Sequence, residues 1–285
     1  MTDATPQATT RTTRRGRPRA FNDKAEQNTI RALDRAMALL HRLSLSDGMS
    51  LTDLAQEAGE APATVYRVLI TLQGHGMVEL DPATQFWHVG AETFRAGTAF
   101  LRRTSVVERA RGPMQWLMRE SGETANLGIE HGDEVLFLSQ VETHQAIRAF
   151  FPPGTRSPMH VSGIGKALLA WSAPGRVRGI VARMGLERFT PRTLVTASAL
   201  EDDLTATRKR GYAFDDEERA EGMRCIAAPV FNPHGEPVAG LSVSAPGFRL
   251  DAGSVQQMGT LVARAAAQVT EAIGGAVPAA QANSD

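Results

Sequence analysis

The chain has 285 residues, 42% of them hydrophobic and 22% charged, which is enough for about two globular domains that each bury a core. The formal net charge is zero, and the single cysteine, Cys225, excludes an intramolecular disulfide and a cysteine-based zinc site within one chain. No apolar run approaches the ~20 residues that span a membrane, and no signal-peptide core is visible, so we expect a cytoplasmic protein without a membrane partner.

Residues 1–25 are rich in threonine, arginine and proline and predict a disordered basic arm. Inside it, the run RGRP with Arg15 and Arg17, followed by Arg19, is similar to the core of an AT-hook. Such an arm inserts arginine into the narrow minor groove of A·T-rich DNA, where the negative potential is enhanced. A basic tail that only aids solubility is the alternative, and the neighbouring motif favours the arm.

A first domain is predicted over residues 26–90. Its first helix is indicated by apolar residues at three- and four-residue steps, and it should end near Asp47-Gly48. We expect this apolar face to support the helices that follow. The face consists of Ile30, Leu33, Met37, Leu40 and Leu43.

Residues 50–89 show the pattern of a winged helix-turn-helix. Ser50 followed by Asp53 predicts a capped helix that ends at Gly59, and Pro62 suits the first position of a second helix. Two β-like runs then predict a hairpin.

The second helix of this pattern should enter the major groove of DNA. Val65 and Leu69 face inward, so the opposite side is free to approach DNA, and Arg67 can reach a guanine edge or a phosphate. An ordinary helical pair with a solvated outer face is the alternative. The predicted DNA-contacting residues are Pro62, Ala63, Thr64, Tyr66 and Arg67.

Residues 91–105 predict a linker helix. Large apolar residues such as Phe94 suit a linker and dimer contact better than a monomer surface, and core packing within its own domain is the alternative.

Residues 106–275 predict a second domain of the α+β class with a mainly antiparallel sheet, before a flexible tail over residues 276–285. Pro113 should start or kink a helix. The predicted helices are 106–120, 176–184, 200–210 and 254–273, with a further helix at the end of 159–171. The β-like runs are 124–130, 135–141, 146–151, 224–231 and 238–245.

The run SGIGK, with Gly163 and Ile164, lacks the spacing of a phosphate-binding loop. Glycines that open a helix still expose free amides at its positive end, which suits a small anion; a plain glycine turn is the alternative. Ser242 and Ser244 share one face of a predicted strand, across a hairpin from Cys225. Together they could line a polar pocket for a small oxygen-rich ligand.

Catalysis is not expected. The histidines show no recognisable nucleophile–base pattern with the cysteine, and no metal-ligand spacing is present. The acidic residues near 215–221 and the basic N-terminus suggest separate roles for the two ends of the chain.

Three stretches resemble the IclR family of transcriptional regulators. They are ATVYRVLITLQGHGMVE (63–79), MHVSGIGKALLA (159–170) and GYAFDDEERAEGMRCIAAPVFNPHGEPVAGLSVSAP (211–246), and the resemblance extends over about residues 30–273. It implies a winged helix, a linker helix and a GAF-like effector-binding domain. It also implies homodimers or homotetramers that bind near-palindromic double-stranded DNA operators, and it implies neither a cofactor nor a metal.

The resemblance also implies a site for a small carboxylate effector. Family members that sense glyoxylate or pyruvate bind the ligand at positions that match seven residues here. These are the amides of Gly163 and Ile164, the acid Asp215, the apolar Met223, the thiol of Cys225 and the hydroxyls of Ser242 and Ser244. Small-acid sensors typically carry alanine at the position of Ile164, so its side chain either narrows the pocket or leaves only its amide in use.

Glyoxylate is therefore the expected effector, and genes of glyoxylate or related small-acid assimilation are the expected targets. An aromatic or sugar-derived acid is the alternative ligand. Covalent addition of the Cys225 thiol to an aldehyde is a further hypothesis. Outside this class, the alternatives are a small-molecule enzyme with a helical accessory domain and an architectural DNA binder that uses mainly the arginine arm.

Overall fold

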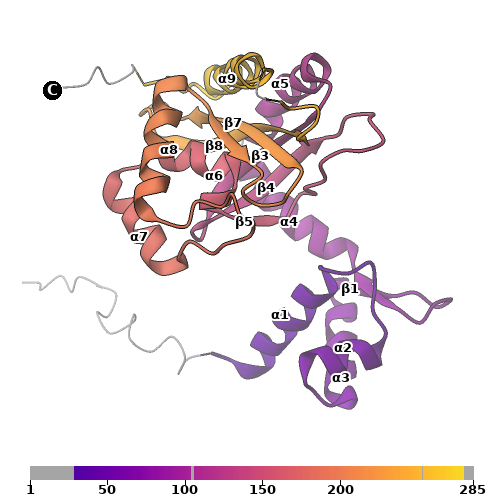
Figure 1. Ribbon diagram of the computed structural model, residues 1–285. Helices are drawn as coiled ribbons and strands as arrows, with labels where there is room; N and C mark the ends of the chain where they lie inside the picture. Colours follow the sequence, from indigo (N-terminus) through magenta and orange to yellow (C-terminus); the bar gives the residue numbers. More distant parts are fainter. Residues whose placement is uncertain (1–28, 104–105, 252, 279–285) are drawn as a thin grey trace, which may run out of the picture. The chain divides into compact units, whose positions relative to one another are not determined.

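The computed structural model describes residues 29–103, 106–251 and 253–278, and the chain forms two compact units, Met1–Phe100 and Leu101–Asp285 (Figure 1). Helix α4 (Ala91–Arg103) runs across the division between them. None of the helices in these described ranges combines the length and apolar composition that crossing a membrane would need. Arg15, Arg17 and Arg19 of the proposed arm lie outside the described residues.

Before α4, the described residues of the first unit form three helices and a two-stranded antiparallel hairpin. They are α1 (Arg31–Leu43), α2 (Leu51–Ala58), α3 (Pro62–Gly74), β1 (Val78–Leu80) and β2 (Trp87–Val89). The predicted cap of α2 is confirmed, because the Ser50 hydroxyl accepts a hydrogen bond from the Asp53 amide at 3.1 Å. Gly59 ends this helix with a φ of +64°, a conformation that glycine adopts without strain.

Helix α1 differs from its prediction in two respects. It ends at Leu43 rather than near Asp47-Gly48, and its buried residues are Leu39, Leu40 and Leu43. The other predicted core positions are exposed, because α2, α3 and β2 cover only the C-terminal half of the helix. Their exposed fractions are 69% for Ile30, 57% for Leu33 and 54% for Met37.

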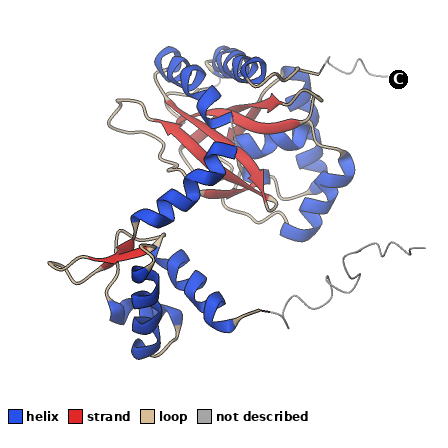
Figure 2. Ribbon diagram, turned by 180° about the vertical axis from the view of Figure 1, so that it is seen from behind, coloured by secondary structure: helices blue, strands red, loops and turns tan. Residues whose placement is uncertain are grey.

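The second unit is built on a six-stranded antiparallel sheet in the order β5-β4-β3-β8-β7-β6, which confirms the predicted α+β class. The strands are β3 (Thr124–His131), β4 (Glu134–Val141), β5 (Arg156–Pro158), β6 (Ala213–Asp216), β7 (Met223–Phe231) and β8 (Pro237–Pro246). Helices α5 (Val106–Ser121) and α9 (Val255–Ala272) pack together on one face (Figures 1 and 2). On the other face lies α6 (Gly163–Ala170), with α7 (Pro174–Met184) and α8 (Ala197–Arg210) beyond it.

Three local predictions for this unit were wrong or incomplete. Residues 146–151 form no strand, because β5 takes the sheet edge beside β4. The irregular segment is instead held by Arg249, whose Nη2 donates to the Ile147 carbonyl at 2.7 Å. Strand β6 was not predicted, and Pro113 lies inside α5, so of its two expected roles the start of a new helix is wrong.

Candidate functional site

The predicted effector residues gather where the first turn of α6 meets β7. The helix begins after Ser162, whose hydroxyl accepts a hydrogen bond from the Gly165 amide at 3.3 Å. A Cβ built on Gly163 would lie 3.2 Å from the Cβ of Cys225 and 3.4 Å from that of Ala227. Glycine therefore lets the positive end of the helix approach the strand closely.

A buried amide orients the two serine hydroxyls. The Asn126 Nδ2 donates to the Oγ of Ser242 at 3.4 Å and of Ser244 at 3.2 Å. Gln140 fixes this orientation, because its Nε2 donates to the Asn126 Oδ1 at 3.0 Å. The serine oxygens accept from this amide, so each hydroxyl still has its own proton to donate, either to a ligand or, for Ser244, to the Cys225 sulfur. The Cys225 Sγ lies 2.9 Å from the Ser244 Oγ.

Asn126 and Gln140 were missed by the sequence analysis. Both lie in runs that were read only as β-rich. They pair with each other across β3 and β4, and Asn126 pairs with Ser242 across β3 and β8. The available signal was an amide side chain in each of two β-like runs, although only the strand register shows that they meet.

Asp215 lies opposite Cys225 in the pairing of β6 with β7. It is 3% exposed, and its Oδ1 accepts a hydrogen bond from the Glu218 amide at 2.8 Å. Burial raises the pKa of the Asp215 carboxyl to about 7, with a contribution from the nearby Glu218. Near neutral pH this carboxyl therefore exists in both protonation states and can either donate or accept a hydrogen bond.

The Cys225 thiol is suited to hydrogen bonding rather than to covalent chemistry. Its side chain is buried, and burial together with the charge of Asp215 raises the pKa of the thiol above its ordinary value. Because the thiolate is the nucleophilic form, this environment disfavours the hypothesis that the Cys225 thiol adds covalently to an aldehyde.

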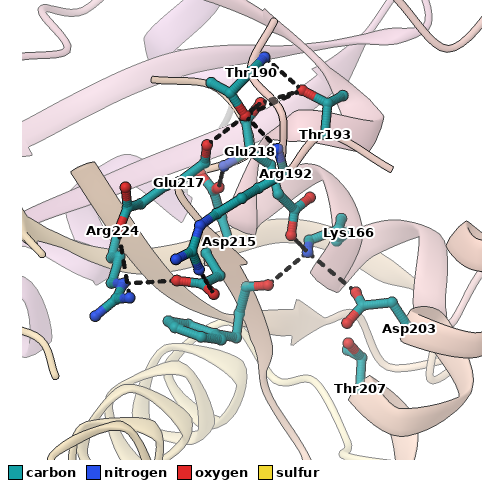
Figure 3. Close-up of polar contacts among 12 residues, drawn as sticks. Lys166, Thr190, Arg192, Thr193, Asp203, Thr207, Asp215, Glu217, Glu218 and Arg224 are labelled. Carbon is teal, nitrogen blue, oxygen red and sulfur yellow. Dashed lines mark hydrogen bonds and ion pairs between the residues drawn. The ribbon is translucent and has the colours of Figure 1, made fainter. Parts of the chain in front are cut away.

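A buried lysine, Lys166, lies in α6, the helix that begins with Gly163 and Ile164 (Figure 3). Lys166 is 0% exposed, and its Nζ lies 2.5 Å from the Glu218 Oε1, 2.5 Å from the Phe214 carbonyl and 3.1 Å from the Asp203 Oδ2. Burial raises the pKa of Glu218. Within the described residues, the Glu218 Oε2 has no hydrogen-bond partner. Lys166 thus connects α6 to β6 and α8.

The acidic run near residue 215 is largely neutralised by ion pairs (Figure 3). Asp216 pairs with Arg192 and with Arg224, and Arg224 also lies 3.3 Å from a carboxylate oxygen of Glu217. The Thr193 hydroxyl donates to the Glu218 carbonyl at 2.7 Å and helps to hold the turn. The run is therefore an internally paired part of the domain rather than a free acidic surface.

The Ile164 side chain fills a hollow in the sheet. A Cβ built on Gly240 would lie 2.8 Å from its Cγ2, and one on Gly128 would lie 3.3 Å from its Cδ1. These glycines pair across β3 and β8, two residues along from Asn126 and Ser242. The backbone amide is therefore the group that Ile164 presents to a ligand. Met223, the predicted apolar wall, is half-buried two residues before Cys225 on β7.

The predicted DNA-contacting face lies on α3. Pro62, Ala63, Tyr66 and Arg67 are exposed and Thr64 is half-buried, whereas Val65 and Leu69 belong to the core. The Arg67 guanidinium has no ion-pair or hydrogen-bond partner in the described part of the chain. The structure therefore leaves this arginine available to contact a partner.

No group of three or more histidine, cysteine, aspartate or glutamate side chains in the described ranges could hold a metal ion.

In the linker helix, Phe94 is 73% exposed, so it does not pack into the core of its own unit.

Two family models match the chain. The IclR helix-turn-helix domain matches residues 32–82, and the C-terminal domain of bacterial transcriptional regulator IclR matches residues 98–271. The chain is 53% identical over 260 residues to the HTH-type transcriptional regulator BhcR of Paracoccus denitrificans, covering 90% of this chain and 93% of that protein. It is 38% identical over 265 residues to the transcriptional repressor IclR of Escherichia coli K12, covering 92% and 97%. The crystal structure of Thermotoga maritima IclR shares the fold, with a TM-score of 0.74 at 24% identity over 86% of this chain and 100% of that one.

Proposed function

This chain belongs to the IclR family of DNA-binding transcriptional regulators, and we propose that a small 2-oxo acid, best represented by glyoxylate, controls its action on DNA. The family and the relatives named above are regulators rather than enzymes. The proposed targets are genes of glyoxylate or related small-acid assimilation, and the proposed location is the cytoplasm.

The observation that supports this effector class is that hydrogen-bond donors lie on both sides of Cys225. A Cβ built on Gly163 would lie 3.2 Å from the Cys225 Cβ, and the Cys225 Sγ lies 2.9 Å from the Ser244 Oγ. The amides of Gly163 and Ile164 open α6, and no described carbonyl outside the helix accepts from them. The hydroxyl oxygens of Ser242 and Ser244 accept from Asn126, which leaves each hydroxyl a proton to donate. Such a set of donors at a positive helix end suits the oxygens of a carboxylate and an adjacent oxo group.

The size of the effector is limited by the Ile164 side chain. This side chain is 0% exposed and already fills the hollow at Gly128 and Gly240. The hollow lies next to the polar cluster, which consists of Asn126, Cys225, Ser242 and Ser244. A bulky aromatic acid would need this volume, whereas a two- or three-carbon acid would not.

For DNA recognition, we propose that α3 enters the major groove and that Arg67 contacts a base edge or a phosphate. A homodimer or dimer of dimers would place two such helices on a near-palindromic operator. Exposed apolar residues at the start of α1 and on α4 support self-association, because exposed apolar surface of this kind favours burial against a second copy. They are Ile30, which precedes α1, Leu33 and Met37 within it, and Phe94 on α4.

The test is a mobility shift of the full chain on its own upstream DNA, titrated with glyoxylate at fixed salt. We expect a specific complex whose apparent affinity changes with glyoxylate and not with acetate. Asn126→Asp replaces the donor amide with an acceptor and should abolish the glyoxylate effect while DNA binding persists. A shift that responds to an aromatic or sugar acid instead would contradict the proposed effector. Absence of any specific shift would contradict the proposed operator.

A further inference from the structure

A cavity of about 270 Å³ lies between α7 and α8, beside the C-terminal end of α6. Its apolar floor is formed by Val177 and Val181 from α7 and by Leu200 and Leu204 from α8. The volume is near the lower end of the range for small-molecule pockets. We propose that this cavity is a second ligand site, for a small amphipathic carboxylate with a short hydrocarbon chain.

The charges on the cavity wall favour an anionic head group. Arg178 and Arg208 both line the cavity, and Glu201 is the single acidic residue among its lining residues. Arg178 has no ion-pair or hydrogen-bond partner among the residues that the structure describes. A guanidinium that borders an apolar cavity can bind a carboxylate with two parallel hydrogen bonds. The apolar floor then takes the hydrocarbon chain.

The cavity is also connected to α6. Arg208 donates from Nη1 to the carbonyl of Ala170, the last residue of α6, at 2.7 Å. One turn earlier on α8, Asp203 lies 3.1 Å from the buried Lys166 of α6. Leu204 lies in one hydrophobic core with Ile164 and Leu168. Helix α8 therefore holds α6 at two points along its length.

A carboxylate that is bound by Arg178 and also contacts Arg208 competes with the Ala170 carbonyl and changes how the end of α6 is held. The opposite end of the same eight-residue helix carries the Gly163 and Ile164 amides of the proposed effector site. Occupancy of the cavity should therefore alter affinity at that site. This link rests on the proposed function, whereas binding in the cavity does not.

The binding test is isothermal titration calorimetry of the full chain with sodium hexanoate. Two partial mimics serve for comparison: hexan-1-ol has the hydrocarbon chain without the carboxylate, and sodium acetate has the carboxylate without the longer chain. We expect one hexanoate per chain, bound at least tenfold more tightly than either mimic. Arg178→Gln should weaken hexanoate binding about tenfold and leave hexan-1-ol unchanged. Arg183→Gln is the matched control, because Arg183 lies on the same helix but pairs with Asp133 outside the cavity, and it should have no effect.

A second variant tests the location. Ala182 is exposed at the cavity rim, so Ala182→Trp can fill the cavity without disturbing the core, and it should abolish hexanoate binding with an unchanged melting temperature. Persistent binding in Ala182→Trp would overturn the proposal. So would loss of hexanoate binding in the Ser242→Ala, Ser244→Ala double variant, because the ligand would then occupy the polar cluster. Absence of hexanoate binding at millimolar concentration would also overturn it.

The link through α6 is tested by titrating glyoxylate with and without saturating hexanoate. We expect at least a threefold change in glyoxylate affinity, and glyoxylate must change hexanoate affinity by the same factor. Equal glyoxylate affinities with and without hexanoate would refute the link. If glyoxylate does not bind at all, the proposed effector fails, and the hexanoate titrations still decide whether the cavity is a ligand site.

Discussion

Single side chains decide what the polar cluster can bind. Ser242, Ser244 and Cys225 could each donate or accept a hydrogen bond, so their presence alone does not define the ligand. The Asn126 amide donates to both serine oxygens, so each hydroxyl keeps a proton that it can donate to another group. Gln140 prevents the amide from turning over. Two residues outside the predicted set therefore support the proposal that the cluster binds an anion.

The protonation of Asp215 leads to a prediction about pH. Its pKa is raised by burial to about 7 in the folded chain, from about 4 in an unfolded one. The folded protein thus retains a proton that the unfolded protein releases between these values, so wild-type stability falls as pH rises through this interval. Asparagine does not titrate. We expect the melting temperature of Asp215→Asn to rise relative to wild type between pH 4 and 7.

The corresponding free energy is about 4 kcal/mol at most, since each unit of pKa shift equals about 1.4 kcal/mol. Thermal unfolding at several pH values measures it. The Asp251→Asn variant is the control, because Asp251 is exposed and its pKa is lowered by hydrogen bonds from Ser254. A stability difference between Asp215→Asn and wild type that does not change with pH would contradict the prediction.

The contact of Ile164 with Gly240 leads to a double-mutant prediction. Ile164→Ala leaves a cavity over the paired glycines and should cost roughly 2–5 kcal/mol of unfolding free energy. Gly240→Ala should also destabilise the domain, because the added methyl would lie 2.8 Å from the Ile164 Cγ2. The double variant should be more stable than the sum of the two losses predicts, since the new methyl occupies part of the vacated volume. Denaturant unfolding of the four proteins measures this coupling, and additive losses would show that the side chains do not share the space.

Helix α6 depends on a buried charge for its position. Lys166 is the single cation within 4 Å of Glu218 among the described ion pairs, and it also contacts Asp203. Removing one partner of a buried ion pair typically costs about 3–5 kcal/mol, because the remaining charge stays buried. We expect this loss for Lys166→Met, and partial recovery in the Lys166→Met, Glu218→Gln double variant.

Chemical denaturation of the full chain measures these changes through the transition of its C-terminal unit. Lys209→Met is the matched control, because Lys209 is an exposed lysine on α8, and it should change stability by less than about 0.5 kcal/mol. If Lys166→Met were no more destabilising than Lys209→Met, the buried pair would not hold α6 in place.

Elements with local signals were predicted well. Ser50, Asp53 and Gly59 define α2 because a capping box and a left-handed glycine act within a few residues of the chain. The run 146–151 was misread because apolar and β-branched residues indicate a strand only if a partner strand is available. The buried face of α1 was misread for a similar reason. Its periodicity shows an apolar stripe but does not show how much of that stripe other helices cover.

The proposed contacts of α3 and of the N-terminal arm with DNA lead to a prediction about operator affinity. Arg67→Ala should weaken operator binding by about 1–3 kcal/mol if the arginine reads a guanine, and it should reduce sequence discrimination. Deleting residues 1–24 should weaken binding but leave part of the sequence preference. Arg119→Ala is the control, because Arg119 is exposed on α5 in the other unit. Mobility shifts at several salt concentrations separate these effects, and complete loss of binding on arm deletion alone would favour the architectural alternative.

Effector control of DNA requires the two units to communicate. A ligand shifts the equilibrium only by the difference between its affinities for two arrangements of the chain, typically 1–3 kcal/mol. Helix α4 is continuous with both units in the chain and is the segment through which we expect this difference to act.

The sequence by itself determined the family, and its resemblance to that family supplied the residues proposed for the effector site. It also determined the order of most elements, because caps, glycine positions and apolar periodicity are local properties of the chain. Tertiary structure alone decided that Asn126 and Gln140 join that site, that Ile164 fills the hollow at Gly128 and Gly240, and that Lys166 is buried among acids. Each of these facts depends on strand register or on burial. Both arise from residues far apart in the chain, and a local pattern carries no information about which distant residues it will meet.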